Sequence, residues 1–191
     1  MLRRNNILSP VSLLVAALAL TPAARGESQW TLTAFGGQMT NNAWEEALNP
    51  TKTDFIDSYL VGLAVGRDFA SRGNWDFGWE GQIVGHFGEQ DHFEFNAPVY
   101  FRYQLPENWR ILKSLTFGIG LSYATEVPQV EIDRDGESGH TLIYWMGEME
   151  FHLPADNVNL VFRLHHRSDG YGVFPYDAGS NAFVLGLRWK H

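Results

Sequence analysis

The sequence of 191 residues contains no cysteine. This absence excludes a disulfide-stapled scaffold, a thiolate zinc site, an iron–sulfur protein and a cysteine nucleophile. Basic residues are also few, since 14 Lys and Arg stand against 22 Asp and Glu, a formal net charge of −8. A nucleic-acid partner is not expected, because a phosphate backbone needs a basic stripe. Phosphate-binding loops, dinucleotide fingerprints and zinc motifs are absent from the sequence, and we predict no cofactor and no metal centre.

Charged residues are scarce as well, at 19% of the chain against roughly 25% in an ordinary soluble domain. Beyond the N-terminal segment, the sequence has no apolar run long enough for a membrane helix. Aromatic residues, in contrast, make up 14% of the chain, and there are 19 glycines. Few charges, many rings and many glycines together are typical of a transmembrane β-barrel.

The N-terminal residues 1–26 have the features of a secretory signal peptide. Arg3 and Arg4 supply the positive start, and the apolar stretch that follows is too short to span a bilayer. Gly26 gives a small residue at the expected cleavage point. A short membrane anchor is the alternative. We predict that residues 27–191 form a single exported barrel domain of the outer membrane.

From residue 29 onward the hydrophobic pattern has a period of two, which is typical of strands with one apolar face. The clearest example is residues 114–123, in which large apolar residues alternate with serine, threonine and glycine. An even number of such segments suits a closed antiparallel barrel. We predict an all-β, eight-stranded antiparallel transmembrane β-barrel, with strands at 29–39, 55–69, 74–88, 92–104, 114–125, 140–153, 158–168 and 181–190.

The placement of charges distinguishes a membrane barrel from the alternative, a soluble sandwich or lipocalin-like barrel. A soluble barrel turns its charged face outward and fills its interior with apolar side chains. Here the apolar face carries aromatic residues near the strand ends, as in the girdles of membrane barrels, and the other face mixes small and charged residues. Charges inside a narrow lumen must pair. The predicted network is Glu80, Glu94, Arg102, Glu148, Glu150, Arg163, Arg167 and Arg188.

A candidate catalytic pair lies near the end of the seventh segment. Strand alternation places His166 and Ser168 on the lipid face, exposed near the level of the lipid headgroups. The points where these two side chains leave the backbone would be roughly 6–7 Å apart. An imidazole nitrogen could therefore reach the hydroxyl that it would activate. Asn181, which opens the eighth segment, is expected to face outward at a similar height. Its amide oxygen could orient the histidine.

The motif His166-x-Ser168, followed by an acidic residue and glycines near the end of an eight-strand barrel, resembles the outer-membrane lipid A 3-O-deacylases, the PagL-type family. Members of that family hydrolyse the ester of the 3-hydroxyacyl chain at position 3 of lipid A from the outer face of the barrel. The resemblance implies that Ser168 is the nucleophile and His166 its base. It also implies that lipid A of lipopolysaccharide, in the outer leaflet, is the substrate. It covers the topology of 27–191 but the motif only over 160–189.

Two residues depart from the family pattern. Asn181 stands where the family has Glu, and Asp169 where it usually has the Asn that helps to form the oxyanion hole. A backbone N–H of Gly170 or Gly172 could take the place of that Asn. Because an amide lacks the charge that stabilises an imidazolium, a second interpretation stays open. It is a non-catalytic outer-membrane barrel of the same shape with a structural or envelope role. A transport pore is not expected, because about eight strands enclose only enough room for side chains.

The remaining polar signals have simpler interpretations. The acidic segments 89–92 and 131–137 could bind Ca²⁺ or Mg²⁺ through carboxylate oxygens, but solvated loops are the preferred interpretation. His165, on the lumen face, is expected to be a structural hydrogen-bonding group. Whether the barrel forms a homodimer stays open.

Overall fold

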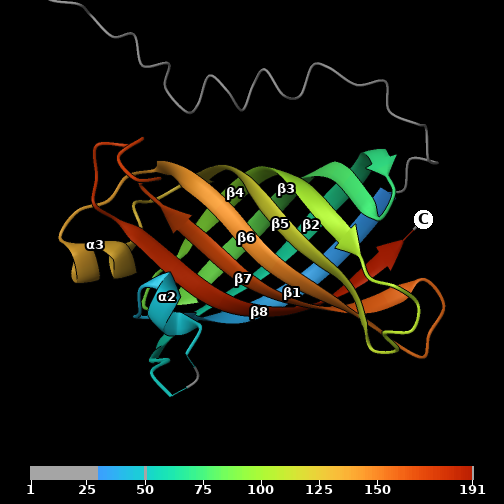
Figure 1. The fold of residues 1–191 in the computed structure, drawn as a ribbon. Helices are drawn as coiled ribbons and strands as arrows, with labels where there is room; N and C mark the ends of the chain where they lie inside the picture. Colours follow the sequence, from blue (N-terminus) through green and yellow to red (C-terminus); the bar gives the residue numbers. More distant parts are fainter. Residues whose placement is uncertain (1–29, 50, 191) are drawn as a thin grey trace, which may run out of the picture.

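The computed structural model describes residues 30–49 and 51–190, which form a closed antiparallel barrel with the strands in sequence order (Figure 1). The predicted signal peptide, residues 1–26, lies outside the described residues. In the described part of the chain, no helix is long and apolar enough to cross a membrane. The strands are β1 (Trp30–Thr40), β2 (Phe55–Arg72), β3 (Trp75–Gly88), β4 (His92–Gln104), β5 (Leu112–Ala124), β6 (Thr141–His152), β7 (Val158–Ser168) and β8 (Gly179–Lys190).

The predicted strands are confirmed, with ends that differ by at most three residues. The largest difference is in β2, which continues to Arg72, so that the tight turn is at 73–74 and not at the predicted 70–73. The register shifts between Asp68 and Ala70. Such an irregularity inserts an extra residue into one strand and interrupts the alternation. The alternation of apolar and polar residues therefore stops before β2 itself ends, and the sequence pattern underestimates the length of this strand.

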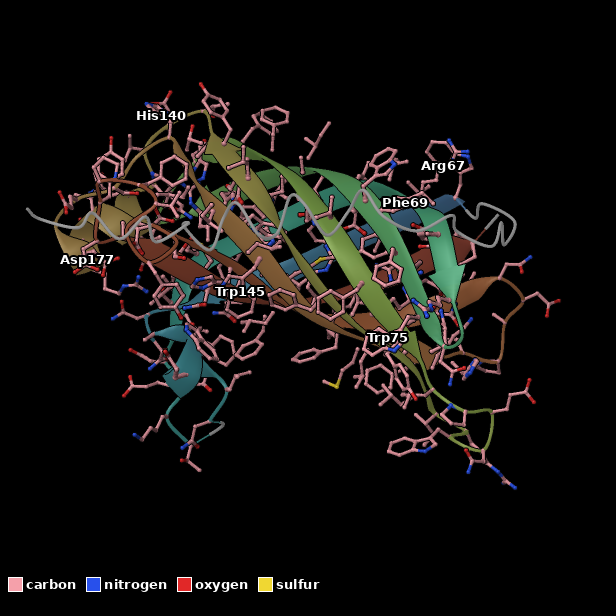
Figure 2. All side chains as sticks on the ribbon, turned by 45° about the horizontal axis from the view of Figure 1, so that its top comes forward. Arg67, Phe69, Trp75, His140, Trp145 and Asp177 are labelled. Atoms are coloured by element: carbon pink, nitrogen blue, oxygen red, sulfur yellow. The ribbon has the colours of Figure 1, made fainter. Side chains whose placement is uncertain are left out.

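The exposure of side chains follows the alternation and gives the barrel an apolar exterior. In β4, Phe93 and Phe95 are 59% and 43% exposed, whereas Glu94 between them is fully buried. Figure 2 shows side chains such as Phe69, Trp75 and Trp145 on the outer wall. Burial of polar residues inside and exposure of rings outside is the arrangement of a transmembrane barrel. The soluble alternative is therefore excluded.

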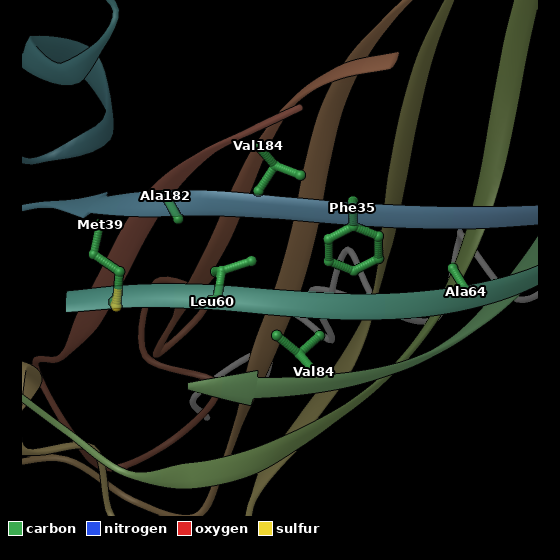
Figure 3. Packing of buried hydrophobic residues seen from close by; sticks show 7 residues of the cluster. All are labelled: Phe35, Met39, Leu60, Ala64, Val84, Ala182 and Val184. Atoms are coloured by element: carbon green, nitrogen blue, oxygen red, sulfur yellow. The ribbon is translucent and has the colours of Figure 1, made fainter. Parts of the chain in front are cut away.

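The lumen is filled by paired charges. Arg163 contacts Glu80 at 2.9 Å and Glu148 at 2.6 Å, and Arg188 contacts Glu148 at 2.6 Å and Glu150 at 3.2 Å. Five of the eight predicted residues therefore form one network of ion pairs, namely Glu80, Glu148, Glu150, Arg163 and Arg188. Glu94 instead contacts His86 and His165. The sequence did not identify two of the partners, which are Asp68 for Arg102 and Glu131 for Arg167. Beside the charges, β1, β2, β3 and β8 contribute an apolar cluster, consisting of Phe35, Met39, Leu60, Ala64, Val84, Ala182 and Val184 (Figure 3).

Four connections lie at one end of the barrel, here named the loop end, which comprises residues 41–54, 89–91, 125–140 and 169–178. Three of these four have ten or more residues. The shorter connections 73–74, 105–111 and 153–157 and the end of β8 lie at the opposite end (Figure 1). In outer-membrane barrels the longer loops face outward from the cell. Two of these loops hold short helices that the sequence did not predict, α2 (Trp44–Ala47) and α3 (Gln129–Asp135). Helices of four and seven residues are too short to display a clear helical period.

Backbones pack closely around Gly120, so the addition of a side chain at this position is expected to destabilise the barrel. A Cβ at this position would meet the Ala97 carbonyl oxygen at 2.1 Å and Pro98 Cα at 2.6 Å. Gly120→Ala is therefore expected to lower the free energy of unfolding by about 1–3 kcal/mol, as overpacking does. Urea unfolding in lipid vesicles measures this change. Gly147→Ala is the matched control, because a Cβ there meets no described atom within 4 Å. Equal stability of the two variants would contradict the prediction.

Candidate functional site

The structure brings His166 and Asn181 together. They are direct cross-strand partners in β7 and β8, and His166 Nδ1 lies 2.6 Å from Asn181 Oδ1. Asn181 Nδ2 donates to the backbone oxygen of Asn42 at 2.7 Å, which turns the amide oxygen toward the imidazole. Since this oxygen only accepts, His166 Nδ1 carries the proton and Nε2 presents its lone pair. The neighbouring groups therefore fix the histidine in the tautomer that a general base requires.

His166 lies on the outer wall, but the prediction that it is exposed is wrong. Its other cross-strand partner is the outward-facing Trp145, whose ring centroid is 4.5 Å away, and only 6% of His166 is exposed. The reason is the loop 41–54, which folds along the outside of the barrel. There Trp44 of α2, the short helix outside the barrel wall in Figure 1, packs edge-on against Trp145, with ring centroids 5.6 Å apart.

Ser168 lies at the end of β7, half-buried, between Ile143 of β6 and Gly179 of β8. Its hydroxyl oxygen accepts a hydrogen bond from the backbone N–H of Gly170 at 3.4 Å. Within the described residues no hydrogen bond joins Ser168 to His166. The structure thus assembles the base and its orienting group, and it places the hydroxyl on the same face two residues further along. Catalytic hydrogen bonds are often long before substrate binds.

In the turn after Ser168, the candidate oxyanion residues differ in the hydrogen bonds that they already make. The Asp169 carboxylate accepts a hydrogen bond from the Gly172 N–H at 2.5 Å, so this donor is already occupied. Gly170 and Gly172 have positive φ angles of 71° and 84°, which glycine adopts without strain. The Gly170 N–H is the donor that points to the serine oxygen. Of the two predicted backbone donors, Gly170 is the better placed to serve an oxyanion at Ser168.

The segment 131–137 is only in part the solvated loop that the sequence suggested, because most of it is exposed but Glu131 turns inward. Glu131, in α3, is fully buried and lies 3.0 Å from Arg167 Nε. The hydroxyls of Ser138 and Ser180 donate to its carboxylate at 2.5 and 2.6 Å. Burial raises the pKa of the Glu131 carboxyl, while Arg167 and the two serines oppose this change. The buried carboxylate attaches α3 to β7 and β8 directly behind the candidate site.

A second group of contacts joins the loops 41–54 and 125–140 to the first residue of β8. Arg134 pairs with Asp135 at 2.7 Å and donates to the backbone oxygens of Gly179 and Asn42. Asp135 in turn accepts from the Gly179 N–H at 3.1 Å. These residues were missed because a run of charges in the sequence does not show which charge folds inward. Their contacts hold the loop that positions Asn42 against Asn181.

Comparisons with known proteins agree on the architecture. No protein-family model matches the sequence, and no curated protein matches it. Among solved structures, the outer membrane enzyme PagL aligns with a TM-score of 0.54 at 12% identity, over 83% of this chain and 98% of that one. Neisserial surface protein A gives a TM-score of 0.52 at 11% identity, over 87% and 100%. Ail, the attachment invasion locus protein of Yersinia pestis, gives 0.50 at 12%, over 86% and 98%.

These similarities show a fold shared with an outer-membrane enzyme, a surface protein and an attachment invasion locus protein, and at such identities they do not assign an activity. Together with the apolar exterior and the closed strand order, they identify the described chain as an eight-stranded β-barrel of the outer membrane.

Proposed function

We propose that this barrel is a serine esterase that removes an ester-linked 3-hydroxyacyl chain from lipid A. The observation that carries the proposal is the contact between His166 Nδ1 and Asn181 Oδ1 on the outer wall, with Ser168 on the same face. The outer wall is where an acyl chain of the outer leaflet meets the protein, so the substrate would approach the half-buried Ser168 without leaving the membrane. The loop 41–54, which covers His166, would have to shift to admit it. The resemblance of the His166-x-Ser168 motif to the lipid A 3-O-deacylases suggests which ester is cleaved.

In this mechanism Ser168 Oγ attacks the acyl carbonyl carbon, while His166 Nε2 takes the hydroxyl proton. The Gly170 N–H stabilises the tetrahedral oxyanion. The lipid A hydroxyl then leaves and receives the proton from His166, and the acyl chain stays on Ser168. Water, activated by the same histidine, hydrolyses this acyl-enzyme and releases the 3-hydroxy fatty acid. Asn181 holds the imidazole in orientation throughout.

The rival function is a non-catalytic barrel with a structural, adhesion or envelope role. Two observations favour it. Ser168 is hydrogen-bonded to Gly170 and not to His166 within the described residues, and Asn181 supplies no negative charge for the imidazolium. An assay of fatty acid release separates the two functions. The folded barrel, in mixed micelles with lipopolysaccharide, is expected to release free 3-hydroxy fatty acid, whereas a non-catalytic barrel releases none.

The orienting role of Asn181 predicts a graded response to substitution. Asn181→Leu removes the oxygen that accepts from His166 Nδ1, so the imidazole is no longer held in the tautomer that can act as a base. We expect kcat to fall by about 10²-fold or more. Asn181→Asp keeps an oxygen that accepts from His166 Nδ1 and adds a charge that stabilises the imidazolium, but it loses the donor to the Asn42 oxygen. This variant is therefore expected to lose much less kcat than Asn181→Leu. Fatty acid release measures both. An unchanged kcat in Asn181→Leu would exclude an orienting role.

A further inference from the structure

A group of potential metal ligands lies in the lumen, below the loop 89–91 and apart from the candidate esterase site. His92 and Glu94 are alternate residues of β4 and therefore share its inner face, and His86 of β3 is the direct cross-strand partner of His92. All three side chains are buried, and their ligand atoms lie within 4.8 Å of one another. We infer that His86, His92 and Glu94 bind a divalent transition-metal ion, for which Zn²⁺ is the reference ligand.

The chemistry of the three groups suits such an ion. Imidazole nitrogen and carboxylate oxygen bind Zn²⁺ at about 2.0–2.2 Å, which places tetrahedral ligand atoms about 3.4 Å apart. His86 Nε2 already lies 2.8 Å from Glu94 Oε2, and the rings of His86 and His92 stack with centroids 4.4 Å apart. The two stacked rings are nearly parallel, so one of them must turn about its side-chain torsions before both ring nitrogens can converge on one ion. Three protein ligands leave a fourth position for water.

An unpartnered nitrogen points to a missing ligand. His92 is 5% exposed, and its Nε2 has no hydrogen-bond partner among the described residues. Buried polar atoms are nearly always paired. A metal ion bound at this nitrogen would supply the partner. The same ion would replace the hydrogen bond between His86 and Glu94 by two coordinate bonds.

Neighbouring side chains would hold the ligands in orientation. Gln90 Nε2 lies 3.1 Å from His86 Nδ1, while Gln90 Oε1 is buried without a partner. Rotation of this amide would let Oε1 accept the Nδ1–H of a metal-bound His86, an outer contact typical of histidine ligands. Glu94 is oriented by Ser122 Oγ at 2.9 Å and by His165 Nε2 at 3.2 Å.

The electrostatic surroundings permit a cation. The positive charge of Arg167, two residues beyond His165, is offset by the Glu131 carboxylate at 3.0 Å. Glu89 and Asp91 are exposed on the loop 89–91 directly above the group, so a cation approaches through an acidic surface. The carboxylates of this segment were the ligands that the sequence suggested for Ca²⁺ or Mg²⁺. The structure turns them to solvent and turns His92 inward.

Metal titration of the untagged, refolded barrel after chelator treatment tests the inference. We expect wild type to bind about one Zn²⁺ per barrel, with two imidazole ligands visible in the X-ray absorption spectrum of the bound ion. His92→Gln and Glu94→Gln are expected to weaken binding at least about tenfold, because each removes a direct ligand. His152→Gln, which changes an exposed histidine at the opposite end, is the control and should bind as wild type does.

Absence of stoichiometric binding to wild type would overturn the inference. Binding of wild-type strength in His92→Gln would also overturn it, and the three side chains would then be a hydrogen-bonding network only. Heat-modifiable electrophoretic migration shows whether each variant is folded. If a variant fails to fold, the absorption spectrum of the wild type decides: two histidine ligands support the site, and oxygen ligands alone contradict it.

Discussion

Replacing Ser168 with alanine is expected to reduce the rate of lipid A deacylation by about 10³-fold or more, since it removes the hydroxyl that forms the acyl-enzyme in the proposed mechanism. The folded barrel should otherwise be unchanged. Ser168 is half-buried at the end of β7, and in the described residues its side chain makes one hydrogen bond, with the Gly170 N–H. His166→Ala is expected to lower the rate to a similar residual level, because a nucleophile and its base act as a unit.

Thr51→Ala provides the control for this prediction. Thr51 is an exposed hydroxyl residue of the loop 41–54 that bonds locally to Asn49, and its removal should leave the rate within about twofold. Fatty acid release from lipopolysaccharide measures all three variants under the same conditions. If Ser168→Ala retained the wild-type rate, hydrolysis would proceed without this nucleophile and the proposed mechanism would be wrong.

Glu148→Gln is expected to lower the free energy of unfolding by about 3–5 kcal/mol, because it removes one partner of a buried ion-pair network. Glu148 accepts from Arg163 at 2.6 and 2.9 Å and from Arg188 at 2.6 and 2.9 Å. The substituted amide keeps the shape but directs an NH₂ group at arginine donors. Both arginines would then be short of an acceptor inside the lumen.

The matched control for Glu148 is Glu46→Gln. Glu46 forms an ion pair with Lys52 at 3.9 Å, and the two side chains are 55% and 60% exposed. Exposed pairs contribute about 0–1 kcal/mol, so this variant should unfold nearly as wild type does. Equilibrium urea unfolding in vesicles measures both. A loss below about 1 kcal/mol for Glu148→Gln would mean that the lumen charges do not stabilise the barrel as a network.

The barrel was predictable because alternation is a local property. In β5 each large apolar residue follows a small one, and this pattern alone defines the inner and outer faces. The same argument placed His166 and Asn181 on one face. It could not predict that Trp44 and Asn42 cover them, because that contact depends on how a distant loop folds back over the wall.

The sequence predicted which charged residues are buried in the lumen, but it did not predict which residues they contact. The sequence indicated that Arg167 needs a counter-charge, yet the counter-charge comes from α3, a helix too short to detect. The group of His86, His92 and Glu94 was missed for a related reason. Its ligands come from two strands and meet only because the register pairs His86 with His92. Sequence spacing carries no such information.

Mass spectrometry of lipid A, after incubation with the refolded barrel, tests the central claim most directly. Wild type, Ser168→Ala and His166→Ala would be compared, with folding of each verified by heat-modifiable migration. The account predicts that wild type removes the mass of a single 3-hydroxyacyl chain and that neither variant does. An unchanged lipid A spectrum with correctly folded wild type would contradict the account and establish the non-catalytic barrel.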